Sequence, residues 1–165
     1  MRNLFLLVIA SLFILSCQNK PISKWETLKF IQEKPVLTHI NLGDTAHGHG
    51  DAMAFESILK DTTGKVVGEE LGWVITVDIL EGDSTAPQYA RERIASLVFN
   101  FGNEDEILCQ GMFSYIKGER LIKTGAGQTS VIVGGTGKYK GISGQLTTTR
   151  NDDGTYLHVF DVKQD

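Results

Sequence analysis

The sequence has few cysteines, few prolines and no surplus of positive charge. Two of its 165 residues are cysteine, three are proline, and acidic side chains outnumber basic ones by 20 to 16. The basic residues are scattered along the chain, with Lys138 and Lys140 as the densest pair. A negative net charge without a basic patch argues against nucleic acid or an anionic lipid surface as a partner.

The motifs for nucleotide binding and for serine hydrolysis are also missing, although a glycine cluster suggests the first. The stretch Val131–Gly144 contains five glycines. A P-loop needs Ser or Thr after its Gly-Lys pair, but Tyr139 stands there. A dinucleotide fingerprint needs a third glycine where Lys140 stands, and no Gly-x-Ser-x-Gly motif is present. The glycines therefore predict a tight corner between two strands.

The first residues have the pattern of an export signal. Arg2 precedes an apolar run, Leu4–Leu15, that is too short to span a bilayer as a mature helix. The run ends in Ile14-Leu15-Ser16-Cys17, which resembles the bacterial lipobox. This resemblance implies cleavage before Cys17 and attachment of lipid to its thiol; the alternative is an ordinary signal peptide followed by a chance cysteine. We predict a lipoprotein signal peptide at 1–16 and a protein anchored by lipid in the bacterial cell envelope, at the outer rather than the inner membrane.

Processing at Cys17 would leave one free thiol and a more acidic chain. Cys109 lies in an apolar alternation, where a lone cysteine is most often a buried small hydrophobic residue. Removal of residues 1–16 removes one base and no acid, which leaves 15 basic residues against 20 acidic ones. We expect residues 17–34 to be a lipid-anchored tether and lead-in, in which Trp25–Ile31 forms a short helix or a packing arm.

From residue 35 to the C-terminus the pattern predicts strands joined by short turns. Segments rich in β-branched and aromatic residues alternate between polar and apolar positions, and Asn151-Asp-Asp-Gly154 is a hairpin signal. No amphipathic helical pattern of ten residues or more is present in this part. The expected strands are 36–42, 51–59, 66–80, 91–101, 106–116, a short 120–123, 128–133, 144–150 and 155–163. About eight strands in one domain, 35–165, predict an all-β sandwich or closed barrel.

Three motifs resemble those of plant allene oxide cyclases and dirigent proteins. Val133–Gln145 is similar to the glycine corner of both families, and Gly50-Asp51 is similar to the start of their second strand. Phe99-Asn-Phe-Gly102 followed by Cys109-Gln-Gly111 resembles two barrel strands of allene oxide cyclase. The resemblance covers about residues 36–163 and implies an eight-stranded antiparallel closed β-barrel with an apolar cavity. It also implies a homodimer or homotrimer that acts without a cofactor.

The resemblance is less complete at the functional positions of these families. It places His39 where allene oxide cyclase has an acid and Asn41 where it has an asparagine. Dirigent proteins have an aspartate and an arginine at the positions that Lys138 and Ser143 occupy here. The missing acid argues against a plant-type dirigent role.

Polar residues in the predicted strands are the candidate catalytic groups. A cofactor-free cyclase needs an apolar pocket with a few convergent polar groups that hold its substrate near the cyclic geometry. His39 and Asn41 share one face of a strand by its two-residue period. For every candidate the alternative is a side chain that faces solvent outside the barrel. The catalytic candidates are His39, Asn41, Glu56 and Tyr115, with His158 as a further polar strand residue.

The ligand-binding candidates are aromatic, and the candidate metal ligands lie in one loop. Aromatic side chains in the strands could line the cavity: Phe55, Trp73, Phe99 and Phe113. His47 and His49, between two aspartates, have the donor types of a zinc site. Because no third histidine is near them in sequence, we favour a polar loop at the barrel mouth and expect neither metal nor cofactor.

The predicted function is the binding of a small hydrophobic molecule in the cavity of a lipid-anchored barrel. Two alternatives stay open at this point: a cofactor-free isomerase or cyclase that acts on an unsaturated substrate, and a structural barrel without a ligand. The sequence does not decide whether the protein is an enzyme.

Overall fold

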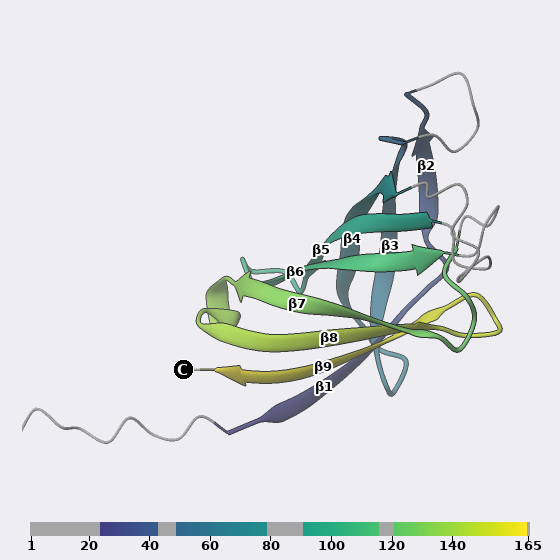
Figure 1. The fold of residues 1–165 in the computed structure, drawn as a ribbon. Coiled ribbons are helices and arrows are strands. Elements are labelled where there is room, and N and C mark those ends of the chain that lie inside the picture. Colours follow the sequence, from purple (N-terminus) through teal and green to yellow (C-terminus); the bar gives the residue numbers. More distant parts are fainter. Residues whose placement is uncertain (1–23, 43–48, 79–90, 116–120, 165) are drawn as a thin grey trace, which may run out of the picture.

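The protein is a closed antiparallel β-barrel (Figure 1). The computed structural model describes residues 24–42, 49–78, 91–115 and 121–164. The predicted signal peptide, Cys17 and His47 lie outside these residues. The strands are β1 (Glu26–Gln32), β2 (Val36–Ile40), β3 (Ala52–Asp61), β4 (Val66–Asp78), β5 (Arg91–Asn100), β6 (Glu106–Tyr115), β7 (Gly127–Gly135), β8 (Ile142–Arg150) and β9 (Tyr156–Gln164).

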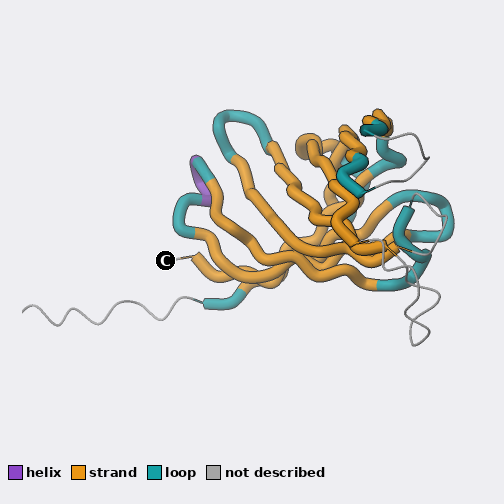
Figure 2. The backbone as a smooth tube through the Cα atoms, turned by 45° about the horizontal axis from the view of Figure 1, so that its top comes forward, coloured by secondary structure: helices purple, strands orange, loops and turns teal. Residues whose placement is uncertain are grey.

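Eight strands close the barrel and one more extends its wall. The strands follow the order β1-β9-β8-β7-β6-β5-β4-β3-β2, and an additional pairing of β1 with β3 closes the circle. Phe30, Ile31 and Gln32 of β1 pair with the last three residues of β3, whereas β2 pairs with its first five. Strands β1 and β2 thus pair with successive parts of the same edge of β3. Figure 2 shows how the strands curve around the barrel interior. The predicted fold class, an eight-stranded antiparallel closed barrel, is confirmed.

The strand that closes the barrel was not predicted. Residues 25–31 were expected to form a short helix or an arm, but Glu26–Gln32 is strand β1, which pairs with β9 over seven residues. The segment alternates with a period of two, and Leu28, Phe30 and Gln32 point inward. Seven backbone pairings with β9 decide the conformation, because a helix of this length is unstable on its own and the edge of β9 supplies hydrogen-bond partners for a strand. The short strand expected at 120–123 is not formed over its described part, residues 121–123.

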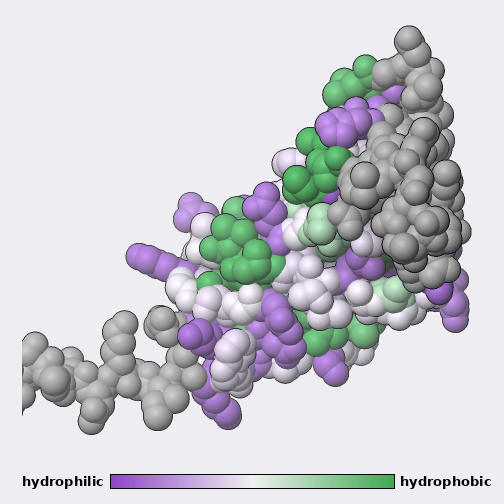
Figure 3. Space-filling model, viewed as in Figure 1, coloured by the Kyte–Doolittle hydropathy of each residue, from purple (hydrophilic) through white to green (hydrophobic). Residues whose placement is uncertain are grey.

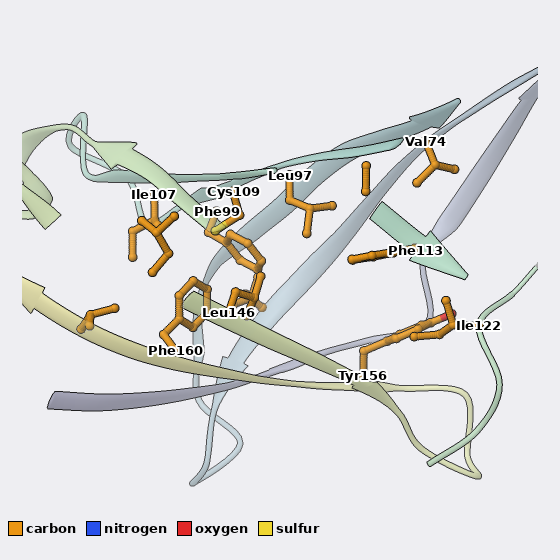
Figure 4. Packing of buried hydrophobic residues seen from close by; sticks show 14 of the residues in the cluster. Val74, Leu97, Phe99, Ile107, Cys109, Phe113, Ile122, Leu146, Tyr156 and Phe160 are labelled. Carbon is orange, nitrogen blue, oxygen red and sulfur yellow. The ribbon is translucent and has the colours of Figure 1, made fainter. Parts of the chain in front are cut away.

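The interior is packed with aromatic side chains near one end of the barrel. Phe99 and Phe160 are fully buried, and their ring centroids lie 4.8 Å apart with an edge-to-face angle of 83°. Phe30 contacts Phe160 and Phe101, and the ring of Phe101 contacts that of Tyr139. Edge-to-face pairs of this kind add stability beyond the buried area. These five rings form what we call the aromatic plug, and Figure 4 shows two of them, Phe99 and Phe160.

The glycine-rich stretch is the corner that closes the plugged end. It makes one turn of 3-10 helix, Gly137–Tyr139, between β7 and β8. Asp105 accepts a hydrogen bond from the backbone N–H of Lys138 at 2.8 Å and forms an ion pair with its ammonium group at 2.9 Å. Gly144 has a φ of +143°, and a Cβ there would lie 2.1 Å from the carbonyl oxygen of Asp161. The prediction of a tight structural corner rather than a phosphate loop agrees with this geometry.

Among the described residues, no helix is long and apolar enough to cross a membrane.

Candidate functional site

A pocket opens at the end of the barrel opposite the glycine corner. Its enclosed cavity has a volume of about 40 Å³, and the free space reaches about 440 Å³ when the open mouth and the solvent in it are included. Most of the lining is apolar, and Figure 4 shows Val74, Phe113, Ile122 and Tyr156 on this side of the plug. The lining residues come from eight strands and two connecting segments: Gln32, Pro35, Leu37, Met53, Phe55, Glu70, Val74, Leu97, Phe113, Tyr115, Leu121, Ile122, Thr148 and Tyr156.

The mouth of the pocket is formed where β1 ends and β2 begins. Pro35, Leu37 and Leu121 are half-buried there, whereas Val74 and Leu97 further in are 2% and 1% exposed. Because a sheet edge with a proline cannot continue the backbone ladder, the link between β1 and β2 bends and leaves the pocket accessible. The gradient of exposure places the entrance at this link.

One wall of the pocket depends on a glycine. Phe55 of β3 pairs with Gly72 of β4, and a Cβ on Gly72 would lie 2.5 Å from the Phe55 ring. The ring therefore lies flat across the backbone of β4, in space that any side chain at position 72 would occupy. Gly72 thus sets how far Phe55 extends into the pocket.

Polar side chains form the inner end of the pocket, next to the plug. His158 is fully buried and packs edge-on against Phe99, with centroids 5.1 Å apart. Its Nδ1 lies 3.0 Å from the hydroxyl of Thr148, and its Nε2 lies 3.2 Å from Gln32 Oε1. The same Nε2 is 2.8 Å from Glu70 Oε2, in a pair that is almost completely buried. Glu70, Gln32 and Thr148 line the pocket, so this group is its polar floor.

Two tyrosines line the pocket nearer its mouth. Burial raises the pKa of Tyr115 to about 12, and Arg93, whose guanidinium carbon lies 4.1 Å above the ring, partly opposes this rise. Burial also raises the pKa of Tyr156, against the effect of Arg150. Both phenols are therefore neutral across the physiological range and can donate a hydrogen bond.

The structure brings three of the predicted site residues together. Tyr115, Phe55 and Phe113 all line the pocket. Phe99 is fully buried in the aromatic plug behind the polar floor, and it does not line the pocket. Trp73 is 42% exposed on the outer face of β4, because it alternates with the inward Val74.

The other candidates lie on the surface. His39 shares the inward face of β2 with Leu37, as the strand period predicts, but β2 extends past the barrel wall and both His39 and Asn41 are exposed. Glu56 is exposed on the outer face of β3. His49 is exposed as well, and the described residues contain no group of three or more metal-ligating side chains.

Sequence reasoning missed the polar floor except for His158. Glu70 stands in the run Val67-Gly-Glu-Glu-Leu71, where either of two adjacent acids could point inward. Its inward direction could have been read from Val74 and Thr76, which share its two-residue period. Gln32 could not have been found in this way, because its segment was not recognised as a strand.

No model of a protein family and no curated protein matches the chain. Several solved structures do. Pyocyanin demethylase matches with a TM-score of 0.63 and 21% identity, over 84% of this chain and 99% of that one. A nonspecific heme-binding cyclase that catalyses a (4 + 2) cycloaddition in neoabyssomicin biosynthesis matches with a TM-score of 0.64 and 14% identity. This match covers 92% of this chain and 68% of the cyclase. The Diels-Alderase AbmU from Streptomyces koyangensis matches with a TM-score of 0.63 and 14% identity, over 94% of this chain and 78% of AbmU. At these identities the chain is similar to them in fold, as a small β-barrel protein.

Proposed function

We propose that the barrel binds a small, mainly apolar molecule in the pocket at its open end. The observation that carries this proposal is the pocket itself: an apolar space inside a closed barrel, with a half-buried rim and a polar floor. Concave apolar sites with a few convergent polar groups are the usual form of small-molecule sites. The neighbours in fold support the proposal, because the names of all three describe proteins that act on small molecules.

A second candidate function is cofactor-free catalysis on the bound molecule. It is favoured by the Glu70–His158 pair at the floor, since buried carboxyl and imidazole groups can move protons, and by the neutral phenol of Tyr115 nearer the mouth. Two of the similar structures are named as a cyclase and a Diels-Alderase. Such an enzyme would orient an unsaturated substrate in the apolar space and accelerate an isomerisation or cyclisation.

The binding proposal is tested with N-phenyl-1-naphthylamine, whose fluorescence rises in apolar sites. Val74→Phe fills the pocket from β4, and Leu37→Trp narrows its rim without entering the core. Ile58→Phe is the matched control, because Ile58 is 46% exposed on the outer face of β3. We expect saturable binding by the wild type, about tenfold weaker binding by the two pocket variants and no change in the control.

The absence of saturable binding by the wild-type protein would contradict the proposal. Equal binding by the wild type and both pocket variants would place the probe elsewhere and contradict it as well. Thermal unfolding of each variant shows whether a loss of binding follows from a loss of fold. Native mass spectrometry of the protein purified from its own cells then identifies a molecule that remains bound.

We also propose that lipid on Cys17 holds the barrel at the cell envelope. Two or more acyl chains on one cysteine would give stable anchoring, because each buried methylene contributes about 0.8 kcal/mol. The lipobox-like sequence before Cys17 supports this. Growth with an alkyne-labelled fatty acid should label the wild type but not Cys17→Ser, and a wild type without label would refute the proposal.

Self-association is a further proposal, supported by the outer face of the barrel. Exposed apolar side chains lie on four adjacent strands, among them Trp73, Ile94, Met112 and Val131. Figure 3 shows apolar patches on the visible side of the barrel. Because such patches mark contact surfaces, we expect a homodimer or homotrimer. Light scattering after gel filtration measures the mass, and Trp73→Lys should shift it toward the monomer; a monomeric wild type would contradict this.

A further inference from the structure

Glu70 is a buried carboxyl group that the binding of an apolar molecule does not use. Its side chain lines the pocket, yet the residue is only 1% exposed. A charged group in this position is costly to bury unless it is paired and fully hydrogen-bonded. The partners of Glu70 therefore decide what the pocket is built to receive.

The hydrogen bonding of Glu70 is incomplete. His158 Nε2 is 3.2 Å from Gln32 Oε1 and 2.8 Å from Glu70 Oε2. Both neighbours are oxygen acceptors, so this nitrogen carries a proton. The N–H is aligned with Gln32, and Glu70 Oε2 receives no aligned hydrogen bond from any described residue. The carboxyl group thus has a near neighbour but an unfilled acceptor position.

Two described arginines act on the tyrosines that line the pocket, Arg93 on Tyr115 and Arg150 on Tyr156. Arg93 pairs with Thr76, six residues along β4 from Glu70, so the backbones of Arg93 and Glu70 lie roughly 20 Å apart at about 3.3 Å per residue. Glu70 interacts electrostatically with Cys109 and Tyr156. Burial, and then the charge of Glu70, raises the pKa of the Cys109 thiol, and the same charge adds to the rise in the pKa of Tyr156. The floor of the pocket thus presents oxygen acceptors from Glu70 and Gln32, whereas its walls are apolar.

We propose that the ligand of this pocket is an apolar molecule that carries a protonated amine or a similar cationic N–H donor, which binds Glu70. This inference rests on the proposed binding function and adds the chemical class of the ligand. The apolar part fills the space between Phe55, Val74 and Phe113, and the donor completes the acceptor position at Glu70 Oε2. His158 Nε2 lies 2.8 Å from the carboxyl group, and Thr148 on the other ring nitrogen fixes the imidazole in this position.

The test compares two probes of the same shape. The first, 1-naphthylmethylamine, is a cation at neutral pH, and the second, 1-ethylnaphthalene, is its uncharged counterpart. Each competes with N-phenyl-1-naphthylamine for the wild type, for Glu70→Gln and for Glu56→Gln. The last is the matched control, since Glu56 is exposed on the outer face of β3. We expect the wild type and the control to prefer the cation by about tenfold or more, and the Glu70→Gln variant by less than threefold.

Equal affinity of the wild type for the two probes would overturn the inference, because it would mean that His158 already satisfies Glu70. This comparison needs no variant, so it stands even if Glu70→Gln fails to fold. A cation preference that survives unchanged in Glu70→Gln would also overturn it. In both cases 1-ethylnaphthalene still binds and the proposed function stands. If neither probe displaces the fluorophore from the wild type, the binding function itself fails.

Discussion

The two ends of the barrel interior differ in composition although the same strands build both. On β9 the inward positions run from Tyr156 at the pocket through His158 to Phe160 in the aromatic plug. On β6 they run from Tyr115 at the pocket to Ile107 in the closed core. One end is sealed by rings in edge-to-face contact, and the other keeps free space above polar groups.

This difference separates stability from function along the length of each strand. A packed aromatic core contributes strongly to folding, because it removes a large apolar area from water. Half-buried side chains at a pocket rim contribute less to folding and are available for a ligand. His158 stands at the boundary, since it packs on Phe99 on one side and holds the polar floor on the other. The plug therefore gives the pocket a rigid base.

The largest expected effect comes from opening the sealed end. Phe160→Ala leaves a cavity beneath two other rings and should lower the free energy of unfolding by about 3–5 kcal/mol. Phe55→Ala at the pocket is the matched variant, and it should cost about half of that or less because Phe55 is already half-buried. Urea denaturation followed by circular dichroism measures both. Equal losses would show that the two ends do not differ in their contribution to folding.

The next effect concerns the corner that closes the plugged end. Gly144→Ala would place a methyl group against the carbonyl oxygen of Asp161 at a φ that side chains rarely adopt, and should cost about 1–3 kcal/mol. Gly134→Ala is the control, since a Cβ there meets nothing within 4 Å and its φ is not positive. It should change the midpoint of urea denaturation only slightly. Similar losses in the two variants would contradict the geometry of the corner.

A smaller effect should appear at high pH. The folded protein raises the pKa of Tyr115 from 10 to about 12, so its contribution to stability is complete below pH 10 and is lost as the pH rises toward 12. Tyr115→Phe should therefore make the melting temperature fall less steeply between pH 10 and pH 12. Tyr139→Phe at the sealed end is the comparison, and its effect should be smaller because Tyr139 is less buried. If neither variant changes the slope of melting temperature against pH between pH 10 and pH 12, the raised pKa of Tyr115 is contradicted.

The sequence predicted the barrel better than the site, and particular residues explain why. Alternation and turn residues define strands locally, so the positions of β2 to β9 followed from the pattern. Strand β1 has the same alternation. However, it is only seven residues long and its main partner, β9, is far away in sequence, so the pattern did not distinguish a strand from a packing arm. The polar floor joins Gln32, Glu70 and His158 across three strands that are distant in sequence. Only the closure of β1 on β3 brings them together, and that long-range pairing leaves no local signal.

The smallest expected effect is the low reactivity of the Cys109 thiol, which lies between the two ends of the barrel. Cys109 is 1% exposed in the core, and burial followed by the charge of Glu70 raises its pKa, so the reactive thiolate is scarce. Iodoacetamide should therefore leave Cys109 unmodified in the folded protein and alkylate it fully in urea, as measured by peptide mass spectrometry. Phe160→Ala should speed the reaction by making the sealed end open more often, whereas Phe55→Ala should change it less. Rapid alkylation of the folded wild type would mean that water reaches the barrel interior beyond the pocket, and the distinction between a sealed and an open end would fail.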